Sequence, residues 1–288
     1  MTAETKPLIS RRLLCLGTLA GISAPRALLA QTAAALEIGV LPNISARALL
    51  AQYQPLHDFF ARSQQPVQIS TAPIWSIFHE RTLAMEYDLV VTAAHLARLA
   101  QLERGLVPLL IFSPDIKALI AVAKSRPLKD IAELRGQVLV LSNPQSLVAF
   151  RGLQWLAEKG LQRDRDFRTI NVPTDDSVGS VVVRGDAVAA LLSSGEFRAT
   201  PDAVKPQFEI MTTIAEVPSF VVLASPRLAA PVQQALKTQL LAFANNSAEG
   251  KAFFGNTGFT GIGEVPSGVM ASMDPYIELT RKSLAVPR

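Results

Sequence analysis

Residues 138–146 read VLVLSNPQS, and residues 147–159 continue as LVAFRGLQWLAEK. The apolar run Val138–Leu141 predicts a short buried strand, and the polar residues behind it predict a loop. Apolar residues then recur at helical spacing over Leu147–Lys159, and Gly160 is a typical helix stop. This unit of strand, polar loop and helix indicates an α/β fold.

The same alternation continues on both sides of this unit. Further strands are expected at Leu36–Leu41, Val67–Thr71, Tyr87–Thr92, Leu109–Phe112, Lys117–Ala123, Asp166–Val172, Ala187–Leu192, Glu209–Ile214 and Phe220–Ala224. Helices are expected from Ser45, at Ile74–Met85, Ala93–Leu102, Ile131–Arg135 and Thr174–Arg184, and over most of the tail after Pro226. Because no repeat or low-complexity linker interrupts this order, the chain fits two lobes joined by crossover strands.

The composition narrows the class of function. The 288 residues are 49% hydrophobic and 18% charged, which excludes a disordered chain, a collagen and a coiled coil. Residues 1–30 carry +3 of the formal net charge of +4, so the rest of the chain is almost neutral. Nucleic acid is not an expected partner, because no stripe of Lys and Arg with interleaved aromatic residues is present.

Residues 1–30 are expected to be an export signal. Arg11 and Arg12 precede a weakly apolar stretch from Leu13 to Ile22, which is too short to span a bilayer. Paired arginines before such a stretch are typical of a twin-arginine (Tat) signal, and an ordinary secretory leader is the alternative. Cleavage is expected near Ala30 or a few residues later, which would leave the mature protein in the periplasm.

The usual signatures of catalysis are absent from the sequence. The single cysteine, Cys15, lies in the expected leader, and there is no nucleophile elbow, P-loop or zincin motif. Of the three histidines, His57 and His79 are expected to be exposed or half-buried groups on helix surfaces. We therefore expect no catalytic residue, no metal and no cofactor, and an enzyme on this fold is only a remote alternative.

Polar residues instead follow several expected strands. His95 and Thr92 come at the end of one strand, and in open α/β sheets ligands bind at that edge. His95 is therefore expected to contact the ligand, with a satisfied structural histidine as the alternative. Asn43 and Ser45, Ser146, and Thr174 with Ser177 each stand between a strand and a helix. Unpaired amides at a helix N-terminus together with a hydroxyl favour an oxyanion, although each Ser or Thr also suits a plain N-cap.

The order of several short segments resembles the phosphonate/phosphite-binding (PhnD-like) periplasmic proteins. The segments that carry the resemblance are Ile38–Pro42 (IGVLP), Tyr53–Leu56 (YQPL), Pro66-Val67, Tyr87–Val90 (YDLV), Leu128–Val138 (LKDIAELRGQV), Asn143–Ser146 (NPQS), Val183–Ala187 (VRGDA) and Val217-Pro218. Each segment is weak alone, but their order and spacing cover nearly all of the chain behind the leader, from Leu36 to Phe254.

The resemblance implies a type II periplasmic binding fold, with a ligand cleft between two α/β lobes. Lobe 1 is expected to comprise residues 31–115 and 221–288, and lobe 2 residues 116–220. Two departures bear on the ligand. The family's Ser-Thr-Ser-Gly anion loop is here Ser146-Leu147-Val148-Ala149, and a ligand-facing aromatic position of the family is here Trp75. Fewer hydroxyl donors and a Trp point to a ligand that differs from, or is less charged than, a free phosphonate.

Three functions fit these expectations. The first is a monomeric solute-binding protein that delivers a small oxyanion, such as a phosphonate or phosphite, to an ABC permease. The second is a ligand-sensing partner of a membrane histidine kinase, and the third is the remote enzyme alternative. Transport and sensing use the same closure around a ligand, so the chain by itself leaves the first two open.

Overall fold

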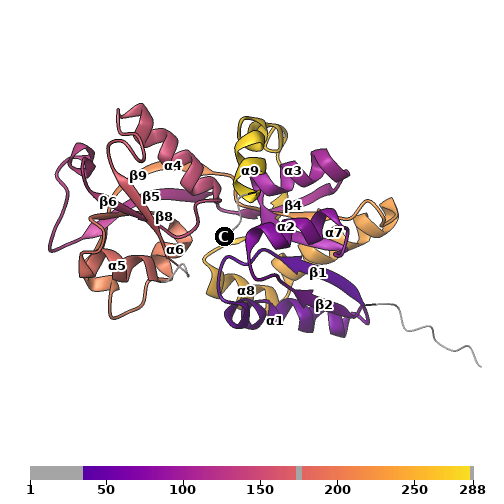
Figure 1. Cartoon of the computed structure of the whole chain (residues 1–288). Helices are drawn as coiled ribbons and strands as arrows, with labels where there is room; N and C mark the ends of the chain where they lie inside the picture. The colour runs from indigo at the N-terminus through magenta and orange to yellow at the C-terminus, as the bar shows by residue number, and fades with distance from the viewer. Residues whose placement is uncertain (1–34, 173–176, 286–288) are drawn as a thin grey trace, which may run out of the picture. The chain divides into compact units, whose positions relative to one another are not determined.

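Two β-sheets form the framework of the protein in the computed structural model, which describes residues 35–172 and 177–285 apart from the side chain of Asn256. Together the residues from Ala33 onward make one compact unit. The first sheet is built from the two ends of this unit and the second from its middle (Figure 1). The α/β class expected from the sequence is confirmed.

The first sheet has six strands in the order β11-β4-β10-β3-β1-β2. Their bounds are β1 Leu36–Val40, β2 Val67–Ser70, β3 Leu89–Ala93, β4 Val107–Ser113, β10 Phe220–Ala224 and β11 Gly261–Glu264. Strands β2, β1 and β3 are parallel, whereas β10 runs antiparallel to both β3 and β4. The parallel strands place the loops before their helices at one common edge.

The second sheet has five strands in the order β7-β6-β8-β5-β9. Their bounds are β5 Ile116–Ala123, β6 Val138–Leu141, β7 Arg168–Asn171, β8 Ala189–Ser193 and β9 Phe208–Val217. Here β7, β6 and β8 are parallel and β5 is antiparallel to β8 and β9. The chain passes between the sheets twice, from β4 into β5 and from β9 into β10.

Helices cover both sheets. Their bounds are α1 Ala46–Arg62, α2 Trp75–Leu83, α3 Ala94–Arg104, α4 Leu147–Glu158, α5 Val178–Arg184, α6 Ser194–Arg198, α7 Ala230–Asn246, α8 Ala248–Thr257 and α9 Ile277–Leu284, with short 3₁₀ turns η1 Ile131–Leu134, η3 Lys205–Gln207 and η4 Ala271–Tyr276. Within the described parts of the chain, no helix is long and apolar enough to cross a membrane.

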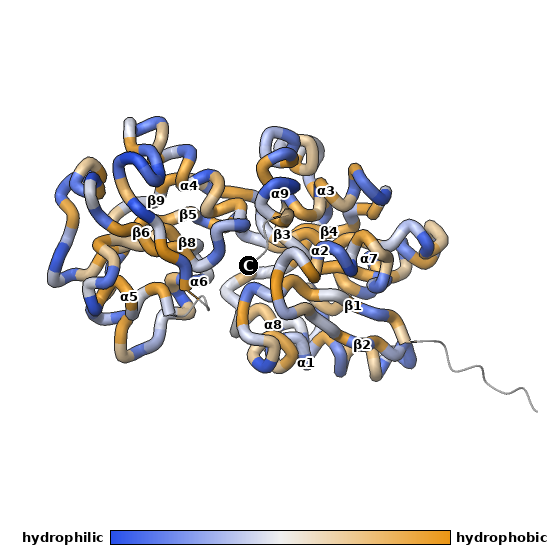
Figure 2. Tube along the Cα trace, viewed as in Figure 1, coloured by the Kyte–Doolittle hydropathy of each residue, from blue (hydrophilic) through white to orange (hydrophobic). Residues whose placement is uncertain are grey.

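The core is continuous from one sheet to the other. A single apolar cluster contains Val90 and Leu223 of the first sheet together with Ile120 and Leu139 of the second. In Figure 2 hydrophobic colour is concentrated along the strands of each sheet, and hydrophilic colour in the outer loops. Burial on both faces explains why strands such as β6 are apolar at every position, since parallel sheets are covered on both sides.

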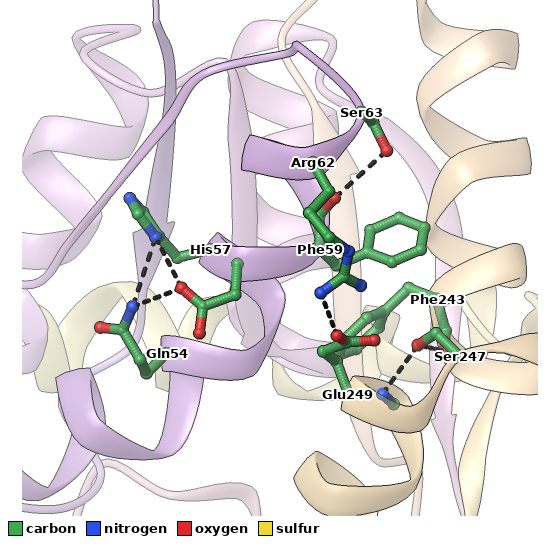
Figure 3. A network of polar contacts seen from close by, with 10 residues as sticks. Gln54, His57, Phe59, Arg62, Ser63, Phe243, Ser247 and Glu249 are labelled. Atoms are coloured by element: carbon green, nitrogen blue, oxygen red, sulfur yellow. Dashed lines mark hydrogen bonds and ion pairs between the residues drawn. The ribbon is translucent and has the colours of Figure 1, made fainter.

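A second apolar cluster fastens α1, α7 and α8 to the first sheet through several phenylalanines. Polar contacts reinforce the packing of α1 on α8, where Arg62 pairs with Glu249 (Figure 3). Ser247 caps α8 by accepting a hydrogen bond from the amide of Gly250 at 2.8 Å. The ion pair thus joins the N-terminal end of α8 to α1, and the cap stabilises the first turn of α8.

Several expectations need correction. His79 is only 5% exposed, not a surface group, because α2 turns it toward the core, whereas His57 is exposed as expected. Helix α6 was not expected, because its five residues are too few for a periodic pattern. Strand β11 begins inside the expected Gly-rich break at residues 255–263 and ends one residue beyond it, so part of that break is a strand. The expected leader and Thr174 lie outside the described residues.

Candidate ligand-binding site

The loops behind β1 and β2 meet at the edge of the first sheet. The indole nitrogen Nε1 of Trp75, the first residue of α2, donates to the carbonyl oxygen of Pro42 at 3.1 Å. Trp75 is 7% exposed and belongs to the apolar cluster that the two sheets share. This bond seats the tryptophan beside Asn43, which follows Pro42 and lines a small cavity with Ile44, Gln52 and Phe259 among others.

Ser45 caps α1 at the same edge. Its Oγ accepts from the amide of Ala48 at 3.4 Å, and its hydroxyl hydrogen has no acceptor among the described residues. Thr92, near the end of β3, is buried, and its hydroxyl makes no hydrogen bond to any residue that the structure describes. Both hydroxyls therefore retain the capacity to donate to another group.

His95 lies in the first turn of α3 and is fully buried. Its Nε2 lies 3.0 Å from the carbonyl oxygen of Gln145, so Nε2 carries the proton and donates. Nδ1 has no hydrogen-bond partner among residues 35–172 and 177–285, and the centroid of the ring lies 5.6 Å from that of Phe150 and 6.4 Å from that of Trp75. Because its Nε2–H is engaged by the carbonyl of Gln145, His95 connects the first sheet to the loop behind β6.

Burial also governs the charge of the two buried histidines. Desolvation lowers the pKa of His95 to about 4, and the hydrogen bond that His95 donates to the carbonyl of Gln145 opposes this shift. Desolvation likewise lowers the pKa of His79 to about 4, with a small opposing effect of Glu103. Both imidazoles are therefore neutral at physiological pH.

The loop behind β6 is held from three directions. The Oδ1 atom of Asn143 accepts a hydrogen bond from the backbone amide of Gln145 at 2.8 Å. The side-chain Nε2 of Gln145 donates to the carbonyl of Ser283 in α9, also at 2.8 Å. Ser146 is the N-cap of α4 and accepts the amide of Ala149 at 3.0 Å. The hydroxyl hydrogen of Ser146 has no acceptor within the described part of the chain.

An acidic group occupies the neighbouring part of the second sheet's edge. Glu196 of α6 accepts hydrogen bonds from the hydroxyl of Ser142, behind β6, and from the amide of Ser193, at the end of β8. Ser193 in turn accepts the amide of Glu196 at 3.1 Å, which completes a capping box. Ser142 therefore donates to a carboxylate, in contrast to Ser146.

The structure brings some of the expected site residues together and leaves others apart. Trp75, His95 and the loop that ends at Ser146 are joined by direct contacts, and Asn43 adjoins Trp75 through Pro42. Ser177 stands at the N-cap position of α5, on another part of the second sheet. Gln145 and Glu196 were missed, although the S-x-x-E pattern at Ser193–Glu196 is the sequence signature of a capping box.

The chain matches one protein family over most of its length. The family model for the periplasmic phosphonate substrate-binding proteins of ABC transporters matches residues 38–266. The chain therefore belongs to this family of periplasmic substrate-binding proteins, as its sequence motifs indicated. A comparison with curated protein sequences gave no match.

Solved structures share the fold at low sequence identity. PhnD1 from Prochlorococcus marinus (MIT 9301), in complex with methylphosphonate, has a TM-score of 0.74 at 14% identity, covering 88% of this chain and 99% of its own. XAC2383 from Xanthomonas citri, bound to ATP, has 0.70 at 22% identity, covering 86% and 98%. The periplasmic aliphatic sulphonate binding protein SsuA from Escherichia coli has 0.60 at 18%, covering 88% and 94%. These likenesses establish a two-lobed periplasmic binding fold.

Proposed function

We propose that the protein captures a small oxyanion of the phosphonate or phosphite type and delivers it to an ABC permease. Export by the leader at residues 1–30 would place it in the periplasm, where its family works. The ligand would lie at the carboxyl edges of the two sheets, where Asn43, Ser45, Thr92 and Ser146 stand, with Thr174 and Ser177 as further donors. Residues 116–220 would close on the remainder about the two connections between the sheets.

The observation that carries the proposal is that the hydroxyl hydrogen of Ser146 has no acceptor among the described residues. The hydroxyl retains a donor hydrogen at the N-cap of α4, and the positive end of the helix dipole favours an anion there. The bond from His95 to Gln145 and the bond from Gln145 to Ser283 hold the loop in one geometry before any ligand arrives. Such preorganisation reduces the entropy lost on binding.

The surroundings of Ser146 bear on the kind of oxyanion. Leu147, Val148 and Ala149 are buried and bring no hydroxyl, and Glu196 adds a negative charge at the same sheet edge. We infer that the ligand carries an organic group and less negative charge than free phosphate. Two of the structural neighbours hold oxyanions that carry organic groups, namely methylphosphonate in PhnD1 and ATP in XAC2383, and XAC2383 has also been solved with chloride.

Two serine variants test the role of Ser146. Calorimetry should be run with methylphosphonate, phosphite, phosphate and an alkanesulfonate on the parent, Ser146→Ala and Ser247→Ala proteins. Ser247 is a matched control, because it is also an N-cap serine but on α8. Both variants should lose about 1 kcal/mol of stability. Only Ser146→Ala should lose affinity, by roughly 10- to 150-fold for a bond to a charged ligand.

Equal ligand affinity in the parent and Ser146→Ala proteins, beside a lowered Tm, would reduce Ser146 to a plain helix cap. Failure of all four oxyanions to bind the parent protein would overturn the ligand class itself.

A further inference from the structure

Another contact between elements packed on the two sheets lies at the ends of α6 and α8. Arg198, the last residue of α6, donates through Nη2 to the carbonyl oxygen of Thr257, the last residue of α8, at 3.2 Å. Unlike the buried bond between His95 and Gln145, this contact involves an exposed side chain. The two contacts thus differ in how easily water can replace them.

The guanidinium of Arg198 also lies flat against Gly258. A Cβ built on Gly258 would come within 1.9 Å of the Arg198 Cζ and 2.2 Å of its Nη2. Gly258 is the C-cap of α8 with a φ of 75°, a conformation that favours glycine in any case. The glycine therefore serves two purposes, since it ends the helix and leaves room for the arginine.

Electrostatics favour a cation at this point. The last carbonyl groups of a helix lack intrahelical partners and carry the negative end of the helix dipole. Within residues 35–172 and 177–285, no carboxylate pairs with Arg198. The partial negative charge at the end of α8 is thus the counter-charge of Arg198. An exposed contact of this kind contributes little free energy, so it can form and break reversibly.

Both ends of the contact are fixed to their own sheets. Helix α8 is fastened to α1 by the Arg62–Glu249 pair (Figure 3). Helix α6 is fastened to the end of β8 by the capping box, and Lys205 donates to the carbonyl of Arg198 at 3.2 Å. The Arg198 contact therefore links an element of one sheet to an element of the other.

We propose that Arg198 is a positioning residue that latches the two lobes in the closed arrangement and thereby sets ligand affinity without touching the ligand. The buried His95–Gln145 bond stays formed as the lobes move, whereas the Arg198–Thr257 bond forms and breaks. The effect on affinity rests on the proposed binding function, but the effect on the lobes does not. Because apparent affinity scales with the closed fraction, loss of the latch should weaken binding about 2- to 12-fold.

The first test needs no ligand. Spin labels are attached at Arg47→Cys on α1 and Lys124→Cys behind β5, both exposed, in a Cys15→Ser background that removes the only native cysteine. Dipolar spectroscopy should show longer distances in Arg198→Ala than in the parent, with Arg198→Lys between them. Arg184→Ala is the control, since Arg184 is exposed and pairs with Asp186 of its own lobe. Identical distance distributions in the parent and Arg198→Ala would overturn the latch.

A double-variant cycle separates the latch from plain strain at Gly258. Gly258→Ala should lengthen the label distance in the parent, because its Cβ displaces the guanidinium, and add nothing in Arg198→Ala. Its strain should lower Tm equally in both backgrounds. A full additional lengthening in the Arg198→Ala background would contradict the proposal.

Methylphosphonate affinity is measured on the same proteins. Weaker binding by Arg198→Ala with longer distances supports the whole proposal, and unchanged binding with longer distances overturns the link to affinity. If methylphosphonate fails to bind the parent protein, the proposed ligand class fails while the distance measurements still decide the latch.

Discussion

The Nε2 atom of His95 donates to the carbonyl oxygen of Gln145 across 3.0 Å, from the first turn of α3 to the loop before α4. The two residues stand 50 positions apart and belong to elements of different sheets. A fully buried and uncharged imidazole thus anchors the loop that ends at Ser146. The predictions below start from this contact.

Replacing His95 should loosen that loop. His95→Phe leaves the carbonyl of Gln145 buried without its donor, which should cost about 1–3 kcal/mol of stability. Hydrogen exchange of the amides in residues 142–149 should accelerate in His95→Phe and less in His95→Gln, which retains a donor. His57→Phe serves as the control, because His57 is exposed on α1. Equal protection of the loop in all four proteins would contradict the anchoring role.

Stability should fall in acid because of His79 and His95. Their folded pKa values of about 4 lie below the value near 6.5 of an unfolded histidine. As pH falls from 6.5 to 4, the unfolded chain binds protons that the folded chain does not, so the free energy of unfolding decreases. The loss should approach about 3 kcal/mol per histidine.

Urea unfolding at a series of pH values measures this slope. The His79→Gln and His95→Gln variants should each show a shallower decline between pH 6.5 and 4 than the parent. A parent protein whose stability is flat over that interval would show that neither histidine is buried in neutral form.

Removing the charge of Glu196 should strengthen the binding of simple oxyanions. Glu196→Gln retains an oxygen that accepts hydrogen bonds but removes a negative charge from the proposed site. The expected gain for methylphosphonate is about fivefold, on the order of 1 kcal/mol. Glu133→Gln is a matched control, because Glu133 holds the same capping-box position in η1. An equal affinity in the parent and both variants would place Glu196 outside the reach of the ligand.

The leader offers a separate prediction. Exchanging both Arg11 and Arg12 for lysine should stop export through the twin-arginine route, since that route reads the arginine pair. Fractionation of cells that express the parent and the variant measures the exported share. Undiminished export of the Lys-Lys variant in cells without the twin-arginine translocon would assign the leader to the general secretory route.

The sequence predicts the framework of the fold better than the site. The strand bounds at Val138–Leu141 and Phe220–Ala224 are confirmed, because short apolar runs between polar loops mark their own ends. The burial of His79 depends on how α2 packs against the rest of the fold, which no local pattern records. Likewise, the bond between Ser142 and Glu196 depends on β6 lying beside β8, two strands separated by 47 residues of chain.

The bond from Gln145 to the carbonyl of Ser283 ties the end of the last helix to the loop before α4. A purification tag or fluorescent protein fused behind Arg288 would therefore pull on the backbone that holds this loop. The loop and Ser283 belong to different lobes, so a change in how the lobes are arranged would be transmitted to the same fusion. The C-terminus is thus a poor place for an inert tag and a good output for a biosensor, while an inert tag belongs elsewhere on the surface.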